Sequence, residues 1–273
     1  MLKVRLLQMD IQPANPESNA NRIVDAIRLA AGDGVELLCA PEMCLTGFDW
    51  KLNRSLGARI EAALASINRA VETHGVGFYG STYRLNADGK ATNSAGLILP
   101  DAAGILTMWY AKTHLFALMD EPQHLTAGNE MVTVVTQWGM LGLAICYDLR
   151  FPEFFHAMAL RGARIILLPA AWPAKRCHHW RTLLQARAIE NQCFIVAVNQ
   201  SGVEGRYGCS GEDAFAAHSM VVDPFGNIKA ELSEPAGYLD VELDLNAVDR
   251  ARKSILTIQD RRPHVYGLAA CRA

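Results

Sequence analysis

Three residues with reactive side chains each follow an apolar stretch of the sequence. Glu42 ends VELLCAPE, Lys112 follows ILTMWYA, and Cys146 ends LGLAIC. A thiol of ordinary pKa is mostly protonated at neutral pH, so a nucleophilic cysteine needs a base or a positive neighbour. A carboxylate can accept its proton, and an ammonium can stabilise a tetrahedral oxyanion. Because active sites of α/β proteins gather at the carboxyl ends of strands, the sequence predicts that these residues meet as base, cation and nucleophile.

Each of the three also has an ordinary structural alternative. Cys146 fills the core as an inert thiol, Glu42 pairs with an arginine, and Lys112 keeps its ammonium in water. The segment YDLRFPEF predicts a helix N-terminus directly after Cys146, where unpaired N–H groups favour negative charge. Asp148 and Arg150 are expected to cap or pair at this helix start, in structural roles.

Apolar runs alternate with amphipathic segments along the chain, which predicts an α/β layered fold. Strands are expected at residues 3–9, 35–41, 76–84, 92–100, 104–112, 131–137, 141–146, 163–170, 193–199, 218–223 and 227–232. Helices are expected at residues 16–34, 55–75, 152–162, 178–192 and 244–255. Consecutive strands mixed with crossover helices predict two sheets packed face to face with helices outside. We expect one domain over residues 1–273, with 255–273 as a C-terminal tail.

Composition restricts the classes of partner. The formal net charge is −2, from 28 acidic and 26 basic residues, so the chain has no overall field to attract nucleic acid or an anionic membrane. The start MLKVRLLQMD lacks the pattern of an export signal, and no apolar run is long enough to span a bilayer, which predicts a cytoplasmic protein. The 7 cysteines include no C-x-x-C pair, which disfavours a disulfide framework and a zinc knuckle.

Cys177, His178 and His179 offer a rival site. Neighbours on a helix point about 100° apart, so this run is poor geometry for a nucleophile and its base, and equally for a metal site. The sequence contains no H-E-x-x-H pattern that would support a metal site, and no metal ion is expected.

The segments PEMCLTGF, YAKTHLF and AICYDLRFPE resemble the three signature segments of the nitrilase superfamily of carbon–nitrogen hydrolases, with Glu42, Lys112 and Cys146 in the triad positions. The similarity extends over LLPAAWPAKRCHHW and LLQARAIENQCFIVAVNQSG, and so over nearly the whole chain. This resemblance implies an α-β-β-α sandwich, a cysteine thioester intermediate, no metal or organic cofactor, and a homodimer or higher homo-oligomer.

Within this family, Glu121 lies where relatives carry a second glutamate that bonds the lysine or positions substrate; a solvated loop residue is the alternative. MDEPQHLTAGN and WPAKRCHHW resemble the ω-amidase branch, which hydrolyses terminal amides of dicarboxylate monoamides such as 2-oxoglutaramate. Such substrates carry a free carboxylate, so a cation should face the pocket. Arg176 is the candidate, with a surface or dimer salt bridge as its alternative.

The Tyr147 backbone N–H is expected to aid the oxyanion. Phe48 and Trp172 are candidates for the cavity wall, with plain core packing as the alternative. The implied activity is release of ammonia from a small amide. A nitrilase, an N-carbamoyl amino acid amidohydrolase and a non-catalytic binding relative remain alternatives, because attack on a nitrile also leads to a thioester.

Overall fold

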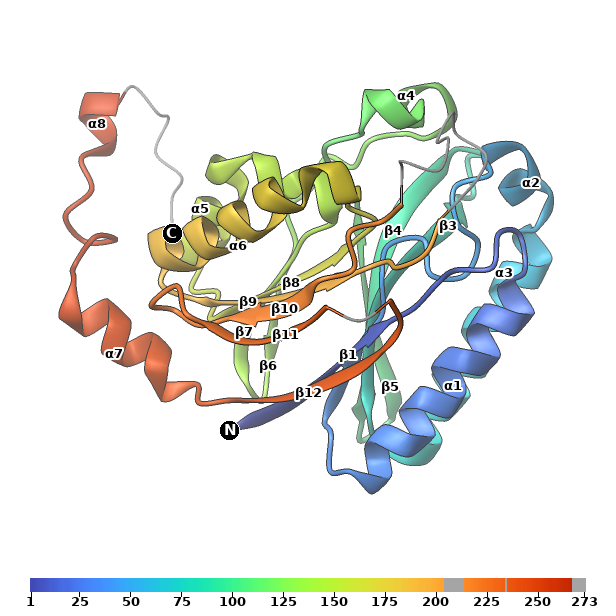
Figure 1. Ribbon diagram of the computed structural model, residues 1–273, viewed down its shortest axis with the longest axis horizontal. Coiled ribbons are helices and arrows are strands. Elements are labelled where there is room, and N and C mark those ends of the chain that lie inside the picture. The colour runs from blue at the N-terminus through green and yellow to red at the C-terminus, as the bar shows by residue number, and fades with distance from the viewer. Residues whose placement is uncertain (204–213, 234, 267–273) are drawn as a thin grey trace.

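The computed structural model describes residues 1–203, 214–233 and 235–266, and within them the strands form two six-stranded sheets (Figure 1). The first sheet contains β1 (Leu2–Gln8), β2 (Leu37–Cys39), β3 (Gly77–Leu85), β4 (Ala91–Asp101), β5 (Gly104–Ala111) and β12 (Gly237–Leu243), in the order β12-β1-β2-β3-β4-β5. The second contains β6 (Thr133–Thr136), β7 (Gly139–Leu143), β8 (Ile165–Ala170), β9 (Phe194–Asn199), β10 (Ser219–Val222) and β11 (Ile228–Leu232), in the order β11-β10-β9-β8-β7-β6.

Both sheets are mixed. Strands β1, β2 and β3 run parallel, as do β7, β8 and β9, and the remaining neighbours pair antiparallel. Apolar side chains fill the space between the sheets because they alternate along the strands. On β1, for example, Leu2, Val4 and Leu6 are fully buried in one cluster with Leu143 and Leu167 of the second sheet.

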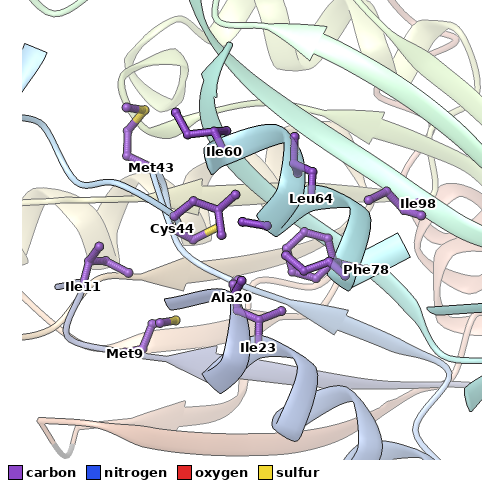
Figure 2. Close-up of a cluster of buried hydrophobic side chains, with 14 of the residues drawn as sticks. Met9, Ile11, Ala20, Ile23, Met43, Cys44, Ile60, Leu64, Phe78 and Ile98 are labelled. Carbon is purple, nitrogen blue, oxygen red and sulfur yellow. The ribbon is translucent and has the colours of Figure 1, made fainter. Parts of the chain in front are cut away.

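Helices α1 (Pro16–Gly32) and α3 (Gly57–His74) cover the outer face of the first sheet (Figure 1). Figure 2 shows Ile60 and Leu64 of α3 close to Phe78 and Ile98 of the sheet, in the cluster that joins these two layers. The Asn15 side chain accepts a hydrogen bond from Ser18 N at the start of α1, as an N-cap should.

Helices α5 (Pro152–Leu160) and α6 (Cys177–Asn191) cover the outer face of the second sheet, where Phe155 and Trp180 are fully buried against β8 and β9. Strand β8 is therefore buried on both faces, which explains its continuous apolar sequence. The layers run helix, sheet, sheet, helix, and the predicted α-β-β-α sandwich is confirmed.

The sequence patterns missed several elements. Strand β12 pairs along the whole of β1, and its Leu239, Val241 and Leu243 alternate with polar residues. The short helices α2 (Trp50–Ser55), α4 (Glu121–His124) and α8 (Pro263–Tyr266) were not predicted, whereas α7 (Asn246–Ser254) was.

The C-terminal segment leaves the sandwich after α7, and α8 lies apart from both sheets (Figure 1). The rest of the predicted tail, residues 267–273 with Cys271, lies outside the described residues, as does Cys209. None of the helices described is long and apolar enough to cross a membrane.

Candidate active site

A pocket with about 330 Å³ of empty volume opens where segments that follow β2, β5, β7 and β8 meet. Glu42, Lys112 and Cys146 all line it. The predicted base, cation and nucleophile therefore share one cavity, although 104 positions separate the first from the last in the sequence.

Lys112 lies between two carboxylates. Its Nζ donates to Glu42 Oε1 at 2.8 Å and to Glu121 Oε1 at 2.7 Å, and all three side chains are at most 2% exposed. Burial alone would lower the pKa of Lys112, but the charges of Glu121 and Glu42 outweigh it and raise that pKa above its usual value. Lys112 therefore carries a positive charge. The alternative, in which its ammonium lies in water at the surface, is excluded because the side chain is buried.

Glu121 is also fixed on its other side, because its Oε2 accepts the Phe116 N–H at 2.7 Å. Burial is the main cause that raises the pKa of this carboxyl, and the Lys112 charge opposes the rise. The residue begins α4 and is fully buried, so it is not a solvated loop residue.

Glu42 accepts three hydrogen bonds. Besides Lys112, the Asn93 Nδ2 donates to Oε1 at 2.8 Å, and the Ala171 N–H donates to Oε2 at 3.1 Å. The carboxylate comes three residues after β2 ends, in a turn and not on the strand itself. Buried charges are tolerated when paired in this way, and here the partner is a lysine rather than an arginine.

Cys146 begins a 3-10 helix, Cys146–Arg150, and has a left-handed φ of 40°. This corrects the predicted placement, because β7 already ends at Leu143 and the α-helix starts only at Pro152. A non-glycine residue in this region carries strain of about 1–3 kcal/mol. The cost is consistent with a side chain that the surrounding fold forces into the pocket.

Burial and the neighbouring Glu42 carboxylate raise the pKa of the Cys146 thiol well above its usual value. The Lys112 charge and the Ala171 backbone N–H act in the opposite sense but do not outweigh them. The resting thiol is thus protonated at neutral pH, and any attack by sulfur requires a base to remove that proton.

Asp148 holds the turn that carries Cys146. It is fully buried, and its Oδ2 accepts Ile145 N at 2.8 Å and the Tyr110 hydroxyl at 2.7 Å. Its Oδ1 lies 2.7 Å from His114 Nδ1. Asp148 therefore has the predicted structural role, and it also ties the cysteine turn to the segment around Lys112.

Two arginines, Arg150 and Arg176, also line the pocket, together with Trp172. Arg176 lies there as predicted, in a 3-10 helix, Ala174–Arg176, whose backbone oxygen at Arg176 accepts Trp172 Nε1–H at 2.9 Å. Neither Arg150 nor Arg176 forms an ion pair with any residue that the structure describes.

The sequence analysis missed the place of Arg150 in this wall. Its guanidinium carbon lies 4.7 Å from the centroid of the Trp172 ring, and burial together with the charge of Arg176 lowers its pKa. The position of Arg150, four residues after the candidate nucleophile, could have indicated this place. The sequence analysis assigned Arg150 to capping or pairing at the helix start instead.

The two remaining candidates have different outcomes. Tyr147 lines the pocket, with its ring centroid 4.8 Å from that of Phe116. Phe48 is not among the residues that line the pocket. Its ring is fully buried in the core cluster of the first sheet, edge-on to Trp50, because the turn after Glu42 directs it inward.

The rival site at Cys177 gains no support. Within the residues described, no group of three or more His, Cys, Asp or Glu side chains could hold a metal ion. The rings of His178 and His179 lie 5.8 Å apart near the start of α6, and neither lines the pocket around Cys146.

Comparisons with known proteins agree with this geometry. The model of the carbon–nitrogen hydrolase family matches residues 3–253. The 2-oxoglutaramate amidase of Bacillus subtilis is 31% identical over 264 residues, which cover 96% of this chain and 98% of the relative.

Two solved structures show the same fold. A CN-hydrolase superfamily protein from Xanthomonas campestris with an arsenic adduct in its active site is 27% identical, with a TM-score of 0.86, covering 96% of this chain and 97% of that one. A mutant amidase from Nesterenkonia sp. AN1 is 26% identical, with a TM-score of 0.83 and coverage of 98% and 99%. In the latter, acrylamide has added to the active-site cysteine.

Proposed function

This chain belongs to the carbon–nitrogen hydrolase family, and from that premise we propose that it hydrolyses the terminal amide of a small dicarboxylate monoamide through a Cys146 thioester. It is a cysteine-dependent amidase that cleaves a non-peptide C–N bond of a small amide. The observation that carries the proposal is the buried Glu42–Lys112–Glu121 cluster beside the Cys146 sulfur in one pocket.

In the first half of the reaction, Glu42 takes the proton of the Cys146 thiol as sulfur attacks the amide carbon. The carbonyl π electrons move to oxygen, and the resulting oxyanion receives hydrogen bonds from Lys112 and the Tyr147 N–H. An ammonium has three N–H donors, and two of those on Lys112 already bond Glu42 and Glu121. The third is the donor that the oxyanion would use.

In the second half, the C–N bond breaks and nitrogen leaves as ammonia with the proton held by Glu42. Glu42 then removes a proton from water, which attacks the thioester carbon. The C–S bond breaks, the sulfur recovers the proton through Glu42, and the product is a carboxylic acid, which loses its remaining proton to the solvent to become a carboxylate. Glu121 keeps Lys112 charged and in place, so the same cation serves both oxyanions.

The two arginines that line the pocket support the choice of substrate class. Arg150 and Arg176 present guanidinium groups to a pocket whose other walls include Phe116 and Met119. Guanidinium groups bind carboxylates with two parallel hydrogen bonds. The relatives named 2-oxoglutaramate amidase support a substrate with a carboxylate at one end and an amide at the other.

An N-carbamoyl amino acid is the second candidate, because it also carries a carboxylate that these arginines would bind. The two substrate classes differ in their final products. The carbamoyl compound yields carbon dioxide, an amino acid and ammonia, whereas the ω-amide yields a dicarboxylate and ammonia.

The test is a screen of ammonia release over ω-amides of dicarboxylates, neutral aliphatic amides, nitriles and N-carbamoyl amino acids. We expect the highest kcat/KM for the carboxylated ω-amides and no ammonia release by Cys146→Ala, whose thermal unfolding serves as the control for folding. Equal rates with neutral amides would contradict the substrate class. An active Cys146→Ala variant would contradict the mechanism.

Assembly into a homodimer or larger homo-oligomer stays a prediction from the resemblance, and residence in the cytoplasm stays a prediction from the sequence pattern. Light scattering coupled to size-exclusion chromatography measures the first, and a monomeric mass at micromolar concentration would contradict it.

A further inference from the structure

Asn93 lies between the two catalytic candidates of the first sheet. It is on β4, fully buried, and its Nδ2 donates to Glu42 Oε1 at 2.8 Å. Its backbone oxygen accepts the Lys112 N–H, also at 2.8 Å. Asn93 does not line the pocket, so it contacts Glu42 and Lys112 without touching a bound substrate.

The two oxygens of Glu42 have different surroundings. Oε1 accepts from both Lys112 and Asn93, whereas Oε2 accepts from the Ala171 N–H. The Ala171 N–H and the Glu42 carboxylate are also among the groups near Cys146 that influence the pKa of its thiol. Because Lys112 and Asn93 both occupy Oε1, Oε2 is the oxygen left to accept the thiol proton.

We infer that Asn93 is a positioning residue that fixes Oε2 of Glu42 as the oxygen that exchanges the proton with Cys146. The terminal torsion of a glutamate is broad, so one donor on one oxygen does not set the orientation of the carboxylate plane. Without Asn93, Lys112 could bond both oxygens and draw Oε2 away from the sulfur. The second donor on Oε1 prevents this rotation. The inference rests on the proposed roles of Glu42 and Cys146.

One further feature of Asn93 fits this role. Its Oδ1 is buried and finds no hydrogen-bond partner among the described residues. An unsatisfied buried oxygen costs about 1–3 kcal/mol. Among the described residues, the Asn93 side chain is therefore held through its N–H donor to Glu42.

The experiment compares Asn93→Ala and the nearly isosteric Asn93→Asp with Thr92→Val as the matched control. Thr92 is the neighbour of Asn93 on β4, and its hydroxyl bonds Ser94 in a separate cavity on the other face of the strand. Two quantities are measured: steady-state kcat and KM against pH, and the rate at which iodoacetamide alkylates Cys146, with Cys177 as the internal standard. Alkylation forms an S–C bond, expels iodide and transfers the thiol proton to the base, so it needs no substrate.

We expect Asn93→Ala to lower kcat and the Cys146 alkylation rate by about 10- to 100-fold, as a misplaced catalytic group does, with KM and Cys177 alkylation unchanged. Asn93→Asp should move the acid limb of the pH profile to higher pH, because a second carboxylate beside Glu42 disfavours a negative charge on the base. Thr92→Val should behave as the wild type in both measurements.

Wild-type alkylation and an unmoved pH profile in both Asn93 variants would overturn the inference. So would a loss in Thr92→Val of the same size, which indicates a general effect on β4. If the wild-type protein released ammonia from no compound in the screen, the proposed function would fail. The Cys146 alkylation rates would still decide whether Asn93 orients the base.

Discussion

The site combines two groups of charged residues, a buried side (Glu42, Lys112 and the adjoining Glu121) and an arginine side (Arg150 and Arg176), which differ in how firmly their charges are held. On one side, Glu42, Lys112 and Glu121 are at most 2% exposed, and hydrogen bonds of 2.7 to 2.8 Å link all three through Lys112 Nζ. On the other side, Arg150 and Arg176 are partly exposed and form no ion pair within the described part of the chain. The first side is built to hold charge at fixed positions, and the second has donors to spare for a ligand.

This difference separates two tasks. Proton transfer and oxyanion stabilisation need atoms placed within about half an ångström, which burial and multiple hydrogen bonds provide. Recognition of a carboxylate needs cations without a partner in the free protein. The two sides should therefore respond to substitution in different ways: the buried side through stability and kcat, the arginine side through KM.

Lys112→Met should have the largest effect, because it leaves Glu42 and Glu121 buried without their counter-ion. Removal of one partner of a buried ion pair costs about 3–5 kcal/mol of unfolding free energy, and we expect ammonia release to be lost. Chemical denaturation measures the first and the ammonia assay the second. The exposed Lys51→Met is the control and should change stability by less than about 0.5 kcal/mol.

The pH dependence of Lys112→Met has a definite sign. Loss of the cation removes the charge that lowers the pKa of Glu121, so the folded-state pKa of this buried carboxyl rises further; the associated stability is fully present below its unfolded pKa, about 4.3, and is lost as pH rises through the folded value. The stability deficit relative to wild type should therefore shrink toward acid pH. In the wild type, the raised pKa of Lys112 preserves its contribution up to alkaline pH. A deficit independent of pH would show that lost packing, not lost charge, causes the effect.

Arg150→Ala and Arg176→Ala test the other side. A hydrogen bond to a charged group contributes about 1.5–3 kcal/mol, so each variant should raise KM for a carboxylated ω-amide by about 10- to 100-fold, with a small change in stability. A neutral aliphatic amide of the same length is the control substrate and should show no change. An equal loss on both substrates would mean that the arginines shape the pocket without binding a carboxylate.

The sequence predicted the buried side better than the arginine side. Glu42, Lys112 and Cys146 each interrupt an apolar run, and a charge or thiol at such a place is a strong signal because burying it is costly. Their shared pocket was therefore expected. Asn93 was missed because a polar residue on a strand is common, and only the fold reveals that its amide meets Glu42.

The aromatic and arginine residues were harder to predict for a physical reason. Phe48 and Trp172 are both buried in core clusters, yet of the two only Trp172 also lines the pocket. Turn geometry decides between these outcomes, and hydrophobicity does not encode it. Arg150 looked like a helix-start residue because Pro152 follows, but the intervening 3-10 helix directs it toward Trp172.

The same limit applies to β12. Its alternation of Leu239, Val241 and Leu243 with Asp240 and Glu242 is a half-buried strand pattern. The strand was overlooked because its solvent face is heavily charged and because its partner, β1, lies at the other end of the chain. Alternation reveals such a strand, but no local signal says which strand it joins.

Trp172→Phe should have the smallest effect and sharpens the comparison most. Phenylalanine keeps an aromatic ring beneath the Arg150 guanidinium but removes the Nε1–H that donates to the Arg176 backbone oxygen. One neutral hydrogen bond contributes about 0.5–1.5 kcal/mol, so KM for a carboxylated ω-amide should rise by about 2- to 10-fold, with kcat unchanged. If kcat fell instead, Trp172 would influence the chemistry through its neighbour Ala171, whose N–H bonds Glu42, and the two sides of the pocket would not be independent. The double variant Trp172→Phe/Arg176→Ala tests whether Trp172 acts by holding Arg176. If it does, both substitutions act through the Arg176 guanidinium, and their effects on KM should be less than additive.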